Sequence, residues 1–574
     1  MINVTIDGIK TSVPQGSTIL QAAKEVGVWV PTLCYHPDQA VKANCRICVC
    51  EVEGNNLLQA ACSQQVYEGM VIKTNSMKVL EARKTILELI LAHHPQDCLN
   101  CIRSGVCELQ DLAEDMAIRD NPFELKVKGM AKDYSTPALF RDPDKCVVCR
   151  RCIDACSVTQ TVYALGMENR GHEAIVVPSM GKDLIDSPCI MCGQCIHACP
   201  VGAIGEVEHI NEFLAAVADP DKVVVTQIAP AIRVAIAEEI GMETGVMPMD
   251  MFVAGLRQLG FDHVMHTNFT ADLTIIEEGH ELLHRVKTGG TLPMVTSCSP
   301  GWINFCETFY PDLLDNLSTC KSPQQMFGTL AKTYWAEKMN IPPEKIYSVS
   351  IMPCVAKKYE ATRPEMQDSG FRDVDIVLTT REIGRLFRMQ RMDFDKLQPS
   401  AFDSWMGAYT GAAVIFGASG GVMEAALRTV YEVVMEEELK DLDFKVVRGM
   451  EGIKEAEVDL KGTKVRVAVG HNLSNARKLM DQVRAGESPY HFIEVMACPG
   501  GCIGGGGQPI TKANAMRQIR IDAIYEEDLA CEIRKSHENP EVKTIYEEFL
   551  HEPLGHKSHE LLHTHYHAKN KKIL

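Results

Sequence analysis

The sequence lacks any long apolar run and any excess of basic charge. Its 574 residues include 58 Lys and Arg against 76 Asp and Glu, a formal net charge of −18 at pH 7. A negative chain is repelled by nucleic-acid phosphates and anionic lipids, so neither is an expected partner. No apolar stretch reaches membrane-spanning length, and the opening MINVTIDGIK lacks the basic and apolar regions of a secretory signal. These features predict a cytoplasmic location with no nucleic-acid or membrane partner.

Cysteine, in contrast, is abundant. The chain has 23 cysteines, many of them separated from the next by only two residues. In a large chain with no expected secretory signal, such spacing favours metal ligation in a reducing compartment over disulfides. The length predicts about three to five domains.

Two cysteine runs share the spacing Cys-x2-Cys-x2-Cys-x3-Cys, and Pro200 follows the second run. This doubled spacing is the ligand pattern of a ferredoxin with two 4Fe–4S clusters, in which the fourth cysteine of each run binds the other cluster. Zinc sites rarely use it. The expected ligands are Cys146, Cys149, Cys152 and Cys199 for one cluster, and Cys189, Cys192, Cys195 and Cys156 for the other. A module with two such clusters transfers single electrons.

The N-terminal segment predicts a small β-rich domain with a 2Fe–2S site. Residues 2–6 and 10–13 favour a hairpin around Asp7-Gly8, and residues 18–26 favour a short helix. Four cysteines follow with gaps of ten, two and thirteen residues, so a loop and a distant strand can enclose a cluster as in plant-type ferredoxins. The expected ligands are Cys34, Cys45, Cys48 and Cys62.

A third pattern combines histidine with cysteine. Its spacing is His-x3-Cys-x2-Cys-x5-Cys, and the expected ligands of a 4Fe–4S cluster are His94, Cys98, Cys101 and Cys107. A neutral imidazole in place of an anionic thiolate should raise the potential of this cluster. His93 is an alternative ligand that the spacing does not exclude.

Up to residue 208 the chain resembles the N-terminal half of two families. One is the cluster-bearing large subunit of respiratory complex I, with its related formate dehydrogenase subunits. The other is the large clostridial-type FeFe-hydrogenases. The cysteine patterns do not distinguish these families, so the remaining two-thirds of the chain must decide.

From about residue 221, short apolar strands alternate with helices. The expected strands are residues 222–228, 292–296, 347–351, 375–379, 464–469 and 492–495. Three of them lead into cysteine-bearing turns, TSCSPGW, MPCVAKKYE and EVMACPGGCIGGGGQP. Ligands of open α/β sheets bind beyond the carboxyl ends of strands, so the three turns can converge on one cofactor. The glycine run at 504–507 permits a close backbone approach there.

These three turns resemble the signatures of FeFe-hydrogenases. In that family the H-cluster, a 4Fe–4S cubane bridged by a cysteine to a diiron azadithiolate site with CO and cyanide ligands, catalyses 2H⁺ + 2e⁻ ⇌ H₂. The resemblance implies cubane ligation by Cys354, Cys498 and Cys502, with Cys502 as the bridge, and a cyanide hydrogen bond from Lys357. It also implies that the pocket is lined by Pro230, Gln324, Met352, Met496 and Phe416.

The chain departs from the family pattern at one position. The usual first motif is TSCCP, whose first cysteine relays protons and whose second binds the cubane. Here the motif is TSCSP, so Ser299 stands at the ligand position after Cys298. Serine is a harder and less acidic ligand than cysteine. Ser299 can ligate through oxygen, Cys298 can replace it as ligand, or three cysteines can hold the cubane. Cys298 is interpreted as the proton relay residue.

The family's proton path also has counterparts. The resemblance implies a relay through Glu278, Glu281 and Ser318 to Cys298. Carboxylates and hydroxyls pass protons along serial hydrogen bonds, and Glu278 and Glu281 are spaced to share one helix face. A solvated acidic helix face is the alternative interpretation of the two glutamates.

The predicted fold is a multidomain α/β chain. Its expected parts are a β-grasp 2Fe–2S ferredoxin-like domain at 1–78, a small His/Cys 4Fe–4S domain at 79–125, a bacterial-type two-cluster ferredoxin domain at 126–208, a large α/β H-cluster domain at 209–520, and a helical C-terminal segment at 521–574. The last part resembles the small subunit that wraps some FeFe-hydrogenases, although its many histidines also suit a metal-binding tail.

The predicted protein is therefore a cytoplasmic FeFe-hydrogenase with an H-cluster, three accessory 4Fe–4S clusters and one 2Fe–2S cluster. Its expected partners are ferredoxin, flavoprotein NAD(P)-linked subunits and the maturation proteins that load the diiron site. No nucleotide-binding motif is evident, so NAD(P) would bind elsewhere. The alternatives are an H₂ sensor and an electron-transfer iron–sulfur subunit, but Cys298 and the three catalytic motifs disfavour both.

Overall fold

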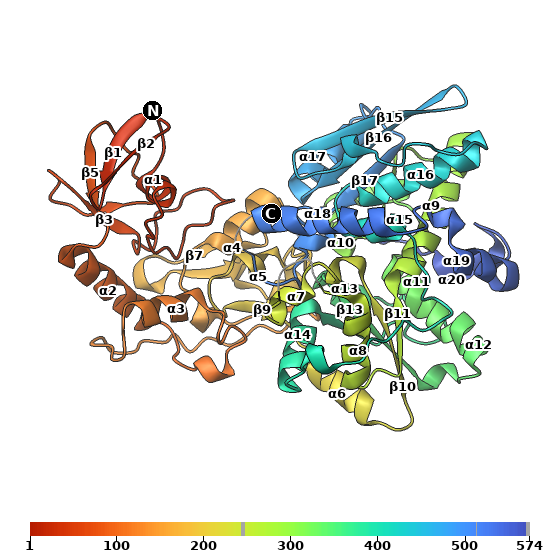
Figure 1. The fold of residues 1–574 in the computed structure, drawn as a ribbon, viewed down its shortest axis with the longest axis horizontal. Coiled ribbons are helices and arrows are strands. Elements are labelled where there is room, and N and C mark those ends of the chain that lie inside the picture. The colour runs from red at the N-terminus through yellow and green to blue at the C-terminus, as the bar shows by residue number, and fades with distance from the viewer. Residues whose placement is uncertain (243–246, 512–513, 570–574) are drawn as a thin grey trace.

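A computed structural model describes residues 1–242, 247–511 and 514–569. The N-terminal domain forms one end of the molecule (Figure 1). Its five strands run β2-β1-β5-β3-β4, and they are β1 Ile2–Ile6, β2 Ile9–Val13, β3 Val49–Val52, β4 Gln59–Ala60 and β5 Met70–Lys73. The predicted hairpin is confirmed, since β1 pairs antiparallel with β2. The predicted helix is α1 Ile19–Glu25, and Thr18 begins it with a capping box.

A small helical domain follows. It contains α2 Met77–Leu91 and α3 Glu108–Asp115. The next domain contains two short antiparallel strand pairs, β6 Leu139–Arg141 with β9 Ile204–Glu206 and β7 Leu165–Glu168 with β8 Ile175–Pro178. Its helices are α4 Arg151–Asp154 and α5 Gln194–Ala198. A buried bidentate ion pair between Arg151 and Glu108, at 2.8 and 3.0 Å, joins the two domains.

The large C-terminal region is built on two four-stranded sheets. In the first, with the order β11-β10-β13-β14, the parallel strands are β10 Val223–Ile228, β11 His263–His266, β13 Ile346–Met352 and β14 Ile376–Thr379. The second sheet has the order β12-β17-β16-β15, and its strands are β12 Met294–Val295, β15 Ile453–Leu460, β16 Thr463–His471 and β17 Phe492–Met496. In this sheet only β15 is antiparallel to its neighbour.

All six strands expected in this region form, with ends shifted by a few residues. Strands β11 and β15 were not predicted. The sequence of β11, HVMH, has a histidine at each end rather than a longer apolar run. Strand β15 has exposed polar residues at alternate positions because it lies at the edge of its sheet.

Helices cover both sheets and connect their strands (Figure 1). The longest is α9 Thr267–Thr288, which directly follows β11 and is buried over most of its length. It packs against α11 Pro323–Leu330 and α16 Gly421–Met435. The remaining helices are α6 Ile210–Ala218, α7 Ile236–Glu239, α8 Met249–Leu259, α10 Pro300–Phe309, α12 Ala336–Met339, α13 Ala356–Glu360, α14 Thr380–Met389, α15 Gly411–Val414 and α17 Leu473–Arg484.

The C-terminal segment contains α18 Asn514–Ala530, α19 Pro540–Ile545 and α20 His556–Leu562. Helix α18 therefore crosses the domain boundary expected after residue 520, and residues 570–574 of the expected segment lie outside the described part. Glu277 of α9 binds this segment, because its buried carboxylate accepts hydrogen bonds from Tyr546, Ser558 and the backbone N–H of Leu554. The segment thus lies against the large region as a strap.

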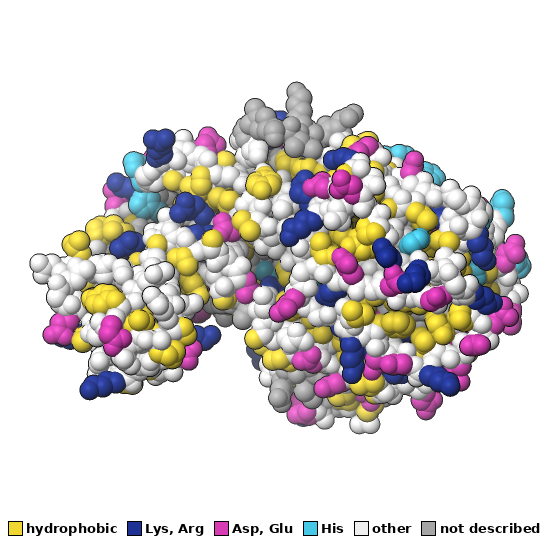
Figure 2. Space-filling model, turned by 90° about the horizontal axis from the view of Figure 1, so that it is seen from above, with side chains coloured by type: hydrophobic (Ala, Val, Ile, Leu, Met, Phe, Trp, Pro, Cys, Tyr) yellow, Lys and Arg dark blue, Asp and Glu magenta, His cyan; other side chains and the backbone are white. Residues whose placement is uncertain are grey.

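Charged side chains of both signs are distributed over the surface. Figure 2 shows acidic side chains scattered among Lys and Arg over the visible face, with no broad basic area. The net charge of −18 is consistent with this view. Within the described ranges, no helix combines the length and apolar character needed to cross a membrane.

Candidate functional site

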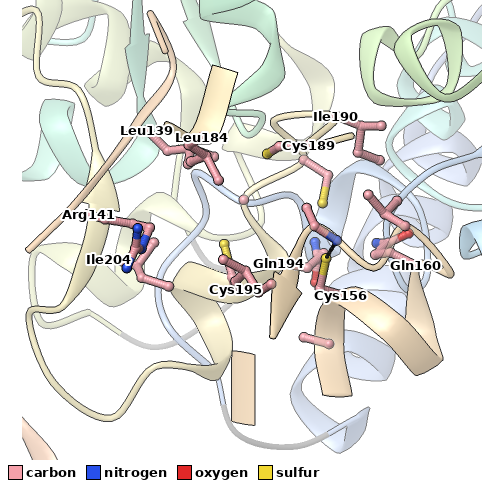
Figure 3. Close-up of a pocket in the computed structure, with 16 residues that line it drawn as sticks. Leu139, Arg141, Cys156, Gln160, Leu184, Cys189, Ile190, Gln194, Cys195 and Ile204 are labelled. Atoms are coloured by element: carbon pink, nitrogen blue, oxygen red, sulfur yellow. Dashed lines mark hydrogen bonds between the residues drawn. The ribbon is translucent and has the colours of Figure 1, made fainter. Parts of the chain in front are cut away.

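The two predicted 4Fe–4S sites lie in two neighbouring cavities of the third domain. One cavity has four cysteines in its wall: Cys156, Cys189, Cys192 and Cys195. The other has the remaining four: Cys146, Cys149, Cys152 and Cys199. Each wall combines three cysteines of one run with the fourth cysteine of the other, as the spacing predicts. Figure 3 shows the thiols of Cys156, Cys189 and Cys195 around the first cavity.

The burial and crowding of these cysteines indicate that a positively charged iron–sulfur core belongs between them. Desolvation raises the pKa of the Cys152, Cys192 and Cys195 thiols well above the usual value, and neighbouring cysteines raise it further. Thiols collected in this way repel one another as thiolates unless a cation lies between them. The donor set therefore fits two iron–sulfur clusters.

The third domain contacts the large region beside the first cavity. The Gln194 amide N–H donates to the Gly504 carbonyl at 2.9 Å, and Nε2 of His197 lies 2.7 Å from the Gly505 carbonyl oxygen. Gln194 also hydrogen-bonds the Cys498 thiol, which lowers the pKa of that thiol against the dominant effect of burial. The first 4Fe–4S site and the third cysteine motif are thus directly connected through Gln194.

The predicted close approach at the glycine run is confirmed, and it is made to backbone. A Cβ on Gly505 would stand 2.3 Å from the Pro353 carbonyl oxygen, and one on Gly506 would stand 2.5 Å from that of Cys192. Gly504 is equally restricted by the Pro499 carbonyl. The glycines hold the third motif against both the second motif and the first 4Fe–4S site, since any side chain would separate them.

The three cysteine motifs converge at the carboxyl ends of strands from both sheets. Cys354 follows β13, Cys498 and Cys502 follow β17, and Cys298 follows β12. Burial, followed by the proximity of Cys354, raises the pKa of Cys502 to about 12. Burial raises the pKa of Cys298 well above its usual value, and Glu278 and Cys502 contribute. The sheet argument therefore correctly placed the motifs in one site.

Lys357 and Gln324 form a polar wall of this site. The Lys357 ammonium donates to the Cys298 carbonyl at 3.1 Å and to the Glu360 carboxylate at 2.8 Å. The Gln324 amide N–H donates to the same Glu360 oxygen at 3.1 Å, whereas Gln324 Oε1 is buried without a hydrogen-bond partner in the described chain. A buried orphan acceptor of this kind indicates room for a polar group. Glu360 orients both side chains and was not predicted.

The apolar pocket residues lie at strand ends and in short helical turns. Met352 ends β13, Met496 ends β17, and both are buried. Pro230 begins a turn after β10, and Phe416 lies in the turn before α16. Phe416 and Met496 belong to the same hydrophobic cluster, against which Cys298 and Cys502 pack. Phe416 and Met496 therefore provide apolar packing beside two of the motif cysteines.

Ser299 precedes α10 at the N-cap position. A serine there normally accepts a hydrogen bond from a backbone N–H of the first turn. The Ser299 side chain makes no such capping bond. Its hydroxyl is therefore not used to begin the helix, although its position in the chain is that of a good cap.

The predicted relay residues form a connected polar path. The Ser318 hydroxyl donates to Glu281 at 2.8 Å and also hydrogen-bonds Glu278. Burial raises the pKa of Glu278 to about 8, and the adjacent Glu281 is the second cause. Arg285 binds the outer side of Glu281 at 2.6 Å. A solvated acidic face is excluded, because the exposed fractions of Glu278 and Glu281 are 3% and 7%.

Sequence reasoning missed Arg285 and Cys320, which both contact Glu281. Cys320 lies in the same turn as Ser318, and its sulfur is 3.8 Å from Oε2 of Glu281. The sequence contains a signal only for Arg285, which stands one helical turn after Glu281. Cys320 is a buried free thiol whose partners come from distant segments, so its spacing along the chain does not reveal them.

The four predicted 2Fe–2S ligands also meet in the structure, as two pairs. The Cys34 thiol hydrogen-bonds that of Cys45, and the Cys48 thiol hydrogen-bonds that of Cys62. Two backbone N–H groups of the 44–45 loop donate to Cys34 Sγ at 3.3 and 3.4 Å. Such donors favour the thiolate form. Cys50 is turned away toward Arg83.

The two candidate histidines differ clearly. His94 is buried and its Nδ1 has no hydrogen-bond partner in the described chain, while burial lowers the pKa of the ring. His93 is exposed, and its Nδ1 lies 3.1 Å from the Leu89 carbonyl oxygen. A neutral imidazole with an unused nitrogen is suited to bind a metal. Of the three cysteines, Cys107 is buried, Cys101 is half-buried and Cys98 is exposed.

This third site adjoins the second 4Fe–4S cavity. Arg103 donates to the Cys199 carbonyl at 3.0 Å, and the Cys107 thiol donates to the Pro200 carbonyl at 3.9 Å. A Cβ on Gly202 would stand 2.4 Å from Cys101 Sγ. The predicted iron–sulfur sites of the second and third domains therefore lie side by side.

Comparison with protein families assigns a description to each part of the chain. Residues 222–506 match "Iron only hydrogenase large subunit, C-terminal domain", and residues 514–569 match "Iron hydrogenase small subunit". Residues 1–77 match a 2Fe-2S iron-sulfur cluster binding domain. Residues 83–122 match the NADH-ubiquinone oxidoreductase-G iron-sulfur binding region, and residues 142–203 match a 4Fe-4S dicluster domain.

Individual relatives match over the full length. The NADP-reducing hydrogenase subunit HndD of Solidesulfovibrio fructosivorans is 50% identical, with 100% of both chains covered. Iron hydrogenase 1 of Clostridium pasteurianum is 40% identical over 99% of this chain and 100% of its own length. Among solved structures, an apo [FeFe]-hydrogenase HydA1 from Chlamydomonas reinhardtii is 44% identical, with a TM-score of 0.57, covering 63% of this chain and 99% of that one.

Proposed function

The chain belongs to the FeFe-hydrogenase family, and from this premise we propose the residues that carry its chemistry. The enzyme catalyses 2H⁺ + 2e⁻ ⇌ H₂ with an H-cluster, and it has 2Fe–2S and 4Fe–4S domains for electron transfer. When bound, the H-cluster supplies the iron and the amine base at which protons and electrons combine. The proposal rests chiefly on the convergence of three cysteine motifs beside a buried proton path.

Cys354, Cys498 and Cys502 are the proposed cysteine ligands of the cubane, with Cys502 as the bridge. Soft thiolates suit iron–sulfur ligation. Lys357 and the free Gln324 Oε1 face the same site, and the ammonium provides a fixed positive charge for an anionic ligand of the diiron part. Pro230, Phe416, Met352 and Met496 exclude water and hold the cofactor's position.

Ser299 is the proposed fourth ligand of the cubane, through its hydroxyl oxygen. Its lack of a capping bond supports this role, because the oxygen is left for another partner. Cys298 is then the residue that exchanges protons with the cofactor. Its thiol lies near Glu278, and its carbonyl is held by the Lys357 ammonium.

The proposed proton path runs from Glu281 through Ser318 and Glu278 to Cys298. Each carrier hydrogen-bonds the next in the first half of the path. A pKa of about 8 for Glu278 lets this carboxyl both bind and release a proton near neutral pH. Arg285 holds Glu281 at the outer end.

Electrons follow a proposed route through the three N-terminal domains. The His94, Cys98, Cys101 and Cys107 site and the 2Fe–2S site both adjoin the cluster on Cys146, Cys149, Cys152 and Cys199. From there the route passes to the cluster on Cys156, Cys189, Cys192 and Cys195, and then to the H-cluster. Asn44, beside the 2Fe–2S ligands, donates to the Val148 carbonyl at 2.7 Å, and Gln194 connects the last two sites. This route uses three accessory 4Fe–4S clusters and one 2Fe–2S cluster.

Flavoprotein subunits that bind NAD(P) are the proposed electron partners, with ferredoxin as a further donor. The full-length likeness to an NADP-reducing hydrogenase subunit supports this. A cytoplasmic location is proposed with it, since none of the cysteines in the described chain is joined in a disulfide, as a reducing compartment favours. Maturation proteins must load the diiron site. Affinity purification from the native host should recover stoichiometric partners, whereas a lone chain with full ferredoxin-linked turnover would contradict the NAD(P)-linked assembly.

Hydrogen–deuterium exchange tests the catalytic proposal without any electron partner. The loaded enzyme should form HD from D₂ in H₂O, because this reaction needs only the H-cluster and the proton path. Cys298→Ala should abolish HD formation while the infrared bands of bound CO and cyanide remain. Exchange at the unmodified rate in that variant would refute the assignment of Cys298.

A further inference from the structure

A second group of ligand-type side chains lies at the outer end of the proton path. Glu281, Cys320 and His563 each offer one ligand atom, and these atoms lie within 4.8 Å of one another. All three residues are buried. They come from α9, from the turn before α11 and from the chain after α20. A β-bridge between Cys320 and His563 fixes the last two segments together.

The orientation of His563 resembles that of a metal-binding histidine. Its Nε2 lies 3.2 Å from a Glu277 carboxylate oxygen, and its Nδ1 lies 2.8 Å from the Thr319 hydroxyl. A carboxylate on one ring nitrogen commonly fixes the tautomer and directs the other nitrogen to the metal. Here that nitrogen is Nδ1, which would exchange its hydrogen bond with the Thr319 hydroxyl for the metal. Glu277 stays anionic, since hydrogen bonds from His563, Ser558 and Tyr546 lower its pKa although burial opposes them.

The donor set selects the class of cation. Thiolate, imidazole and carboxylate together suit Zn²⁺, whereas Mg²⁺ and Ca²⁺ prefer oxygen ligands alone. Cys320 Sγ already lies 3.8 Å from Glu281 Oε2, which is near the ligand-to-ligand separation in a tetrahedral zinc site. Zn²⁺ and the Arg285 guanidinium on Glu281 would bring three positive charges, which the Cys320 thiolate and the Glu281 and Glu277 carboxylates would balance. Three protein ligands leave the fourth position for water.

We propose that Glu281, Cys320 and His563 bind one Zn²⁺ and that the bound ion blocks proton transfer along the path. Binding releases the Cys320 thiol proton to solvent and involves no redox change. The Glu281 oxygen nearest Cys320 is also the oxygen that accepts the Ser318 hydrogen bond. A cation on that oxygen occupies its lone pairs and removes the carboxylate as a proton acceptor. This consequence rests on the proposed relay, whereas the binding itself does not.

The test uses the loaded full-length enzyme and zinc sulfate alone. After incubation and desalting, zinc and iron per chain are measured by mass spectrometry. The zinc environment is then measured by X-ray absorption, and H₂ evolution is measured on the same samples. Cys320→Ala removes the sulfur ligand. Cys306→Ala is the matched control, because Cys306 is also a buried thiol of this region but donates only to the Tyr310 carbonyl.

The unmodified enzyme and Cys306→Ala should each retain one zinc with one sulfur neighbour at about 2.3 Å. Both should lose most H₂ evolution with no loss of iron. Cys320→Ala should need at least tenfold more zinc for half-inhibition relative to its own uninhibited rate. His563→Gln provides a second variant if Cys320→Ala does not fold.

Equal zinc content and inhibition in Cys320→Ala would overturn the site. Displacement of iron in place of one added zinc, or bound zinc without inhibition, would also overturn the proposal. Ser318→Ala, assayed without zinc, separates the two claims. Full turnover in that variant would refute the relay, while the zinc content would still report on the site.

Discussion

Replacement of Glu278 by glutamine tests the proton path most sharply, because the adjacent Glu277 provides a matched control. Both glutamates are buried on α9. Glu278 hydrogen-bonds Ser318 within the path, whereas Glu277 binds the C-terminal strap through Tyr546 and Ser558. Glu278→Gln keeps the shape of the side chain but removes its exchangeable acid proton. We expect it to lower the rate of H₂ evolution by about 10²- to 10⁴-fold, the usual contribution of a positioned proton donor.

The pH dependence gives a second readout. With a pKa of about 8, Glu278 is protonated in about nine-tenths of molecules at pH 7 and in about one-tenth at pH 9. Its contribution to H₂ evolution should therefore fall about tenfold per pH unit above 8, and the low residual rate of Glu278→Gln should lack this fall.

The same pKa predicts a change in stability. Because the folded-state pKa is raised from 4.5 to about 8, the folded protein holds a proton that the unfolded chain releases in this window. Wild-type stability therefore falls as pH rises from 4.5 through 8. The glutamine variant should avoid this loss, which reaches about 5 kcal/mol above pH 8.

The control should behave differently in each respect. Glu277→Gln should keep H₂ evolution within a few-fold of wild type and lower the free energy of unfolding by about 1–3 kcal/mol, because it weakens several buried hydrogen bonds. Rates measured with reduced methyl viologen and thermal unfolding of the loaded enzymes check both variants. Near-wild-type turnover in Glu278→Gln, or an equal loss of turnover in Glu277→Gln, would refute the reasoning.

Three further outcomes test the metal ligands. In Ser299→Ala, the electron paramagnetic resonance signal of the H-cluster cubane should disappear. In Ser299→Cys the signal should remain, and the reduction potential of the cubane should shift. An unchanged signal in Ser299→Ala would exclude oxygen ligation. Cys156→Ala should disturb only the cluster nearer the H-cluster and Cys199→Ala only the other, and the reverse result would contradict the crossed assignment. His94→Cys should lower the potential of its cluster in redox titration, whereas His93→Ala should leave that potential unchanged.

Local spacing explains why much of the site could be predicted. Iron–sulfur ligands recur at short, fixed intervals, so the sequence alone predicted the cysteine runs. It also predicted that Cys156 and Cys199, the fourth cysteines of the two runs, each join the other run's cluster. The strands that end at Cys298, Cys354 and Cys498 were visible as short apolar runs. The parallel-sheet rule then placed their turns in one site.

Contacts between distant segments were not predictable in the same way. Glu360 orients Lys357 and Gln324. Its i, i+3 spacing from Lys357 is a local signal for that pair, but nothing in the local sequence indicates its contact with Gln324. Cys320 and His563 are far apart in the chain and come together only through the C-terminal strap. Pattern reasoning also missed β11 and β15, because one is too short and the other is an edge strand with an exposed face.

We propose that this chain forms a working hydrogenase site with Ser299 in place of the usual cysteine. The most direct test is H₂ evolution from reduced methyl viologen without oxygen, using protein with reconstituted clusters and supplied diiron cofactor. Rapid evolution of H₂ is the expected result. Absence of H₂, despite infrared bands that prove bound CO and cyanide, would contradict it and locate the fault at Cys298 and Ser299.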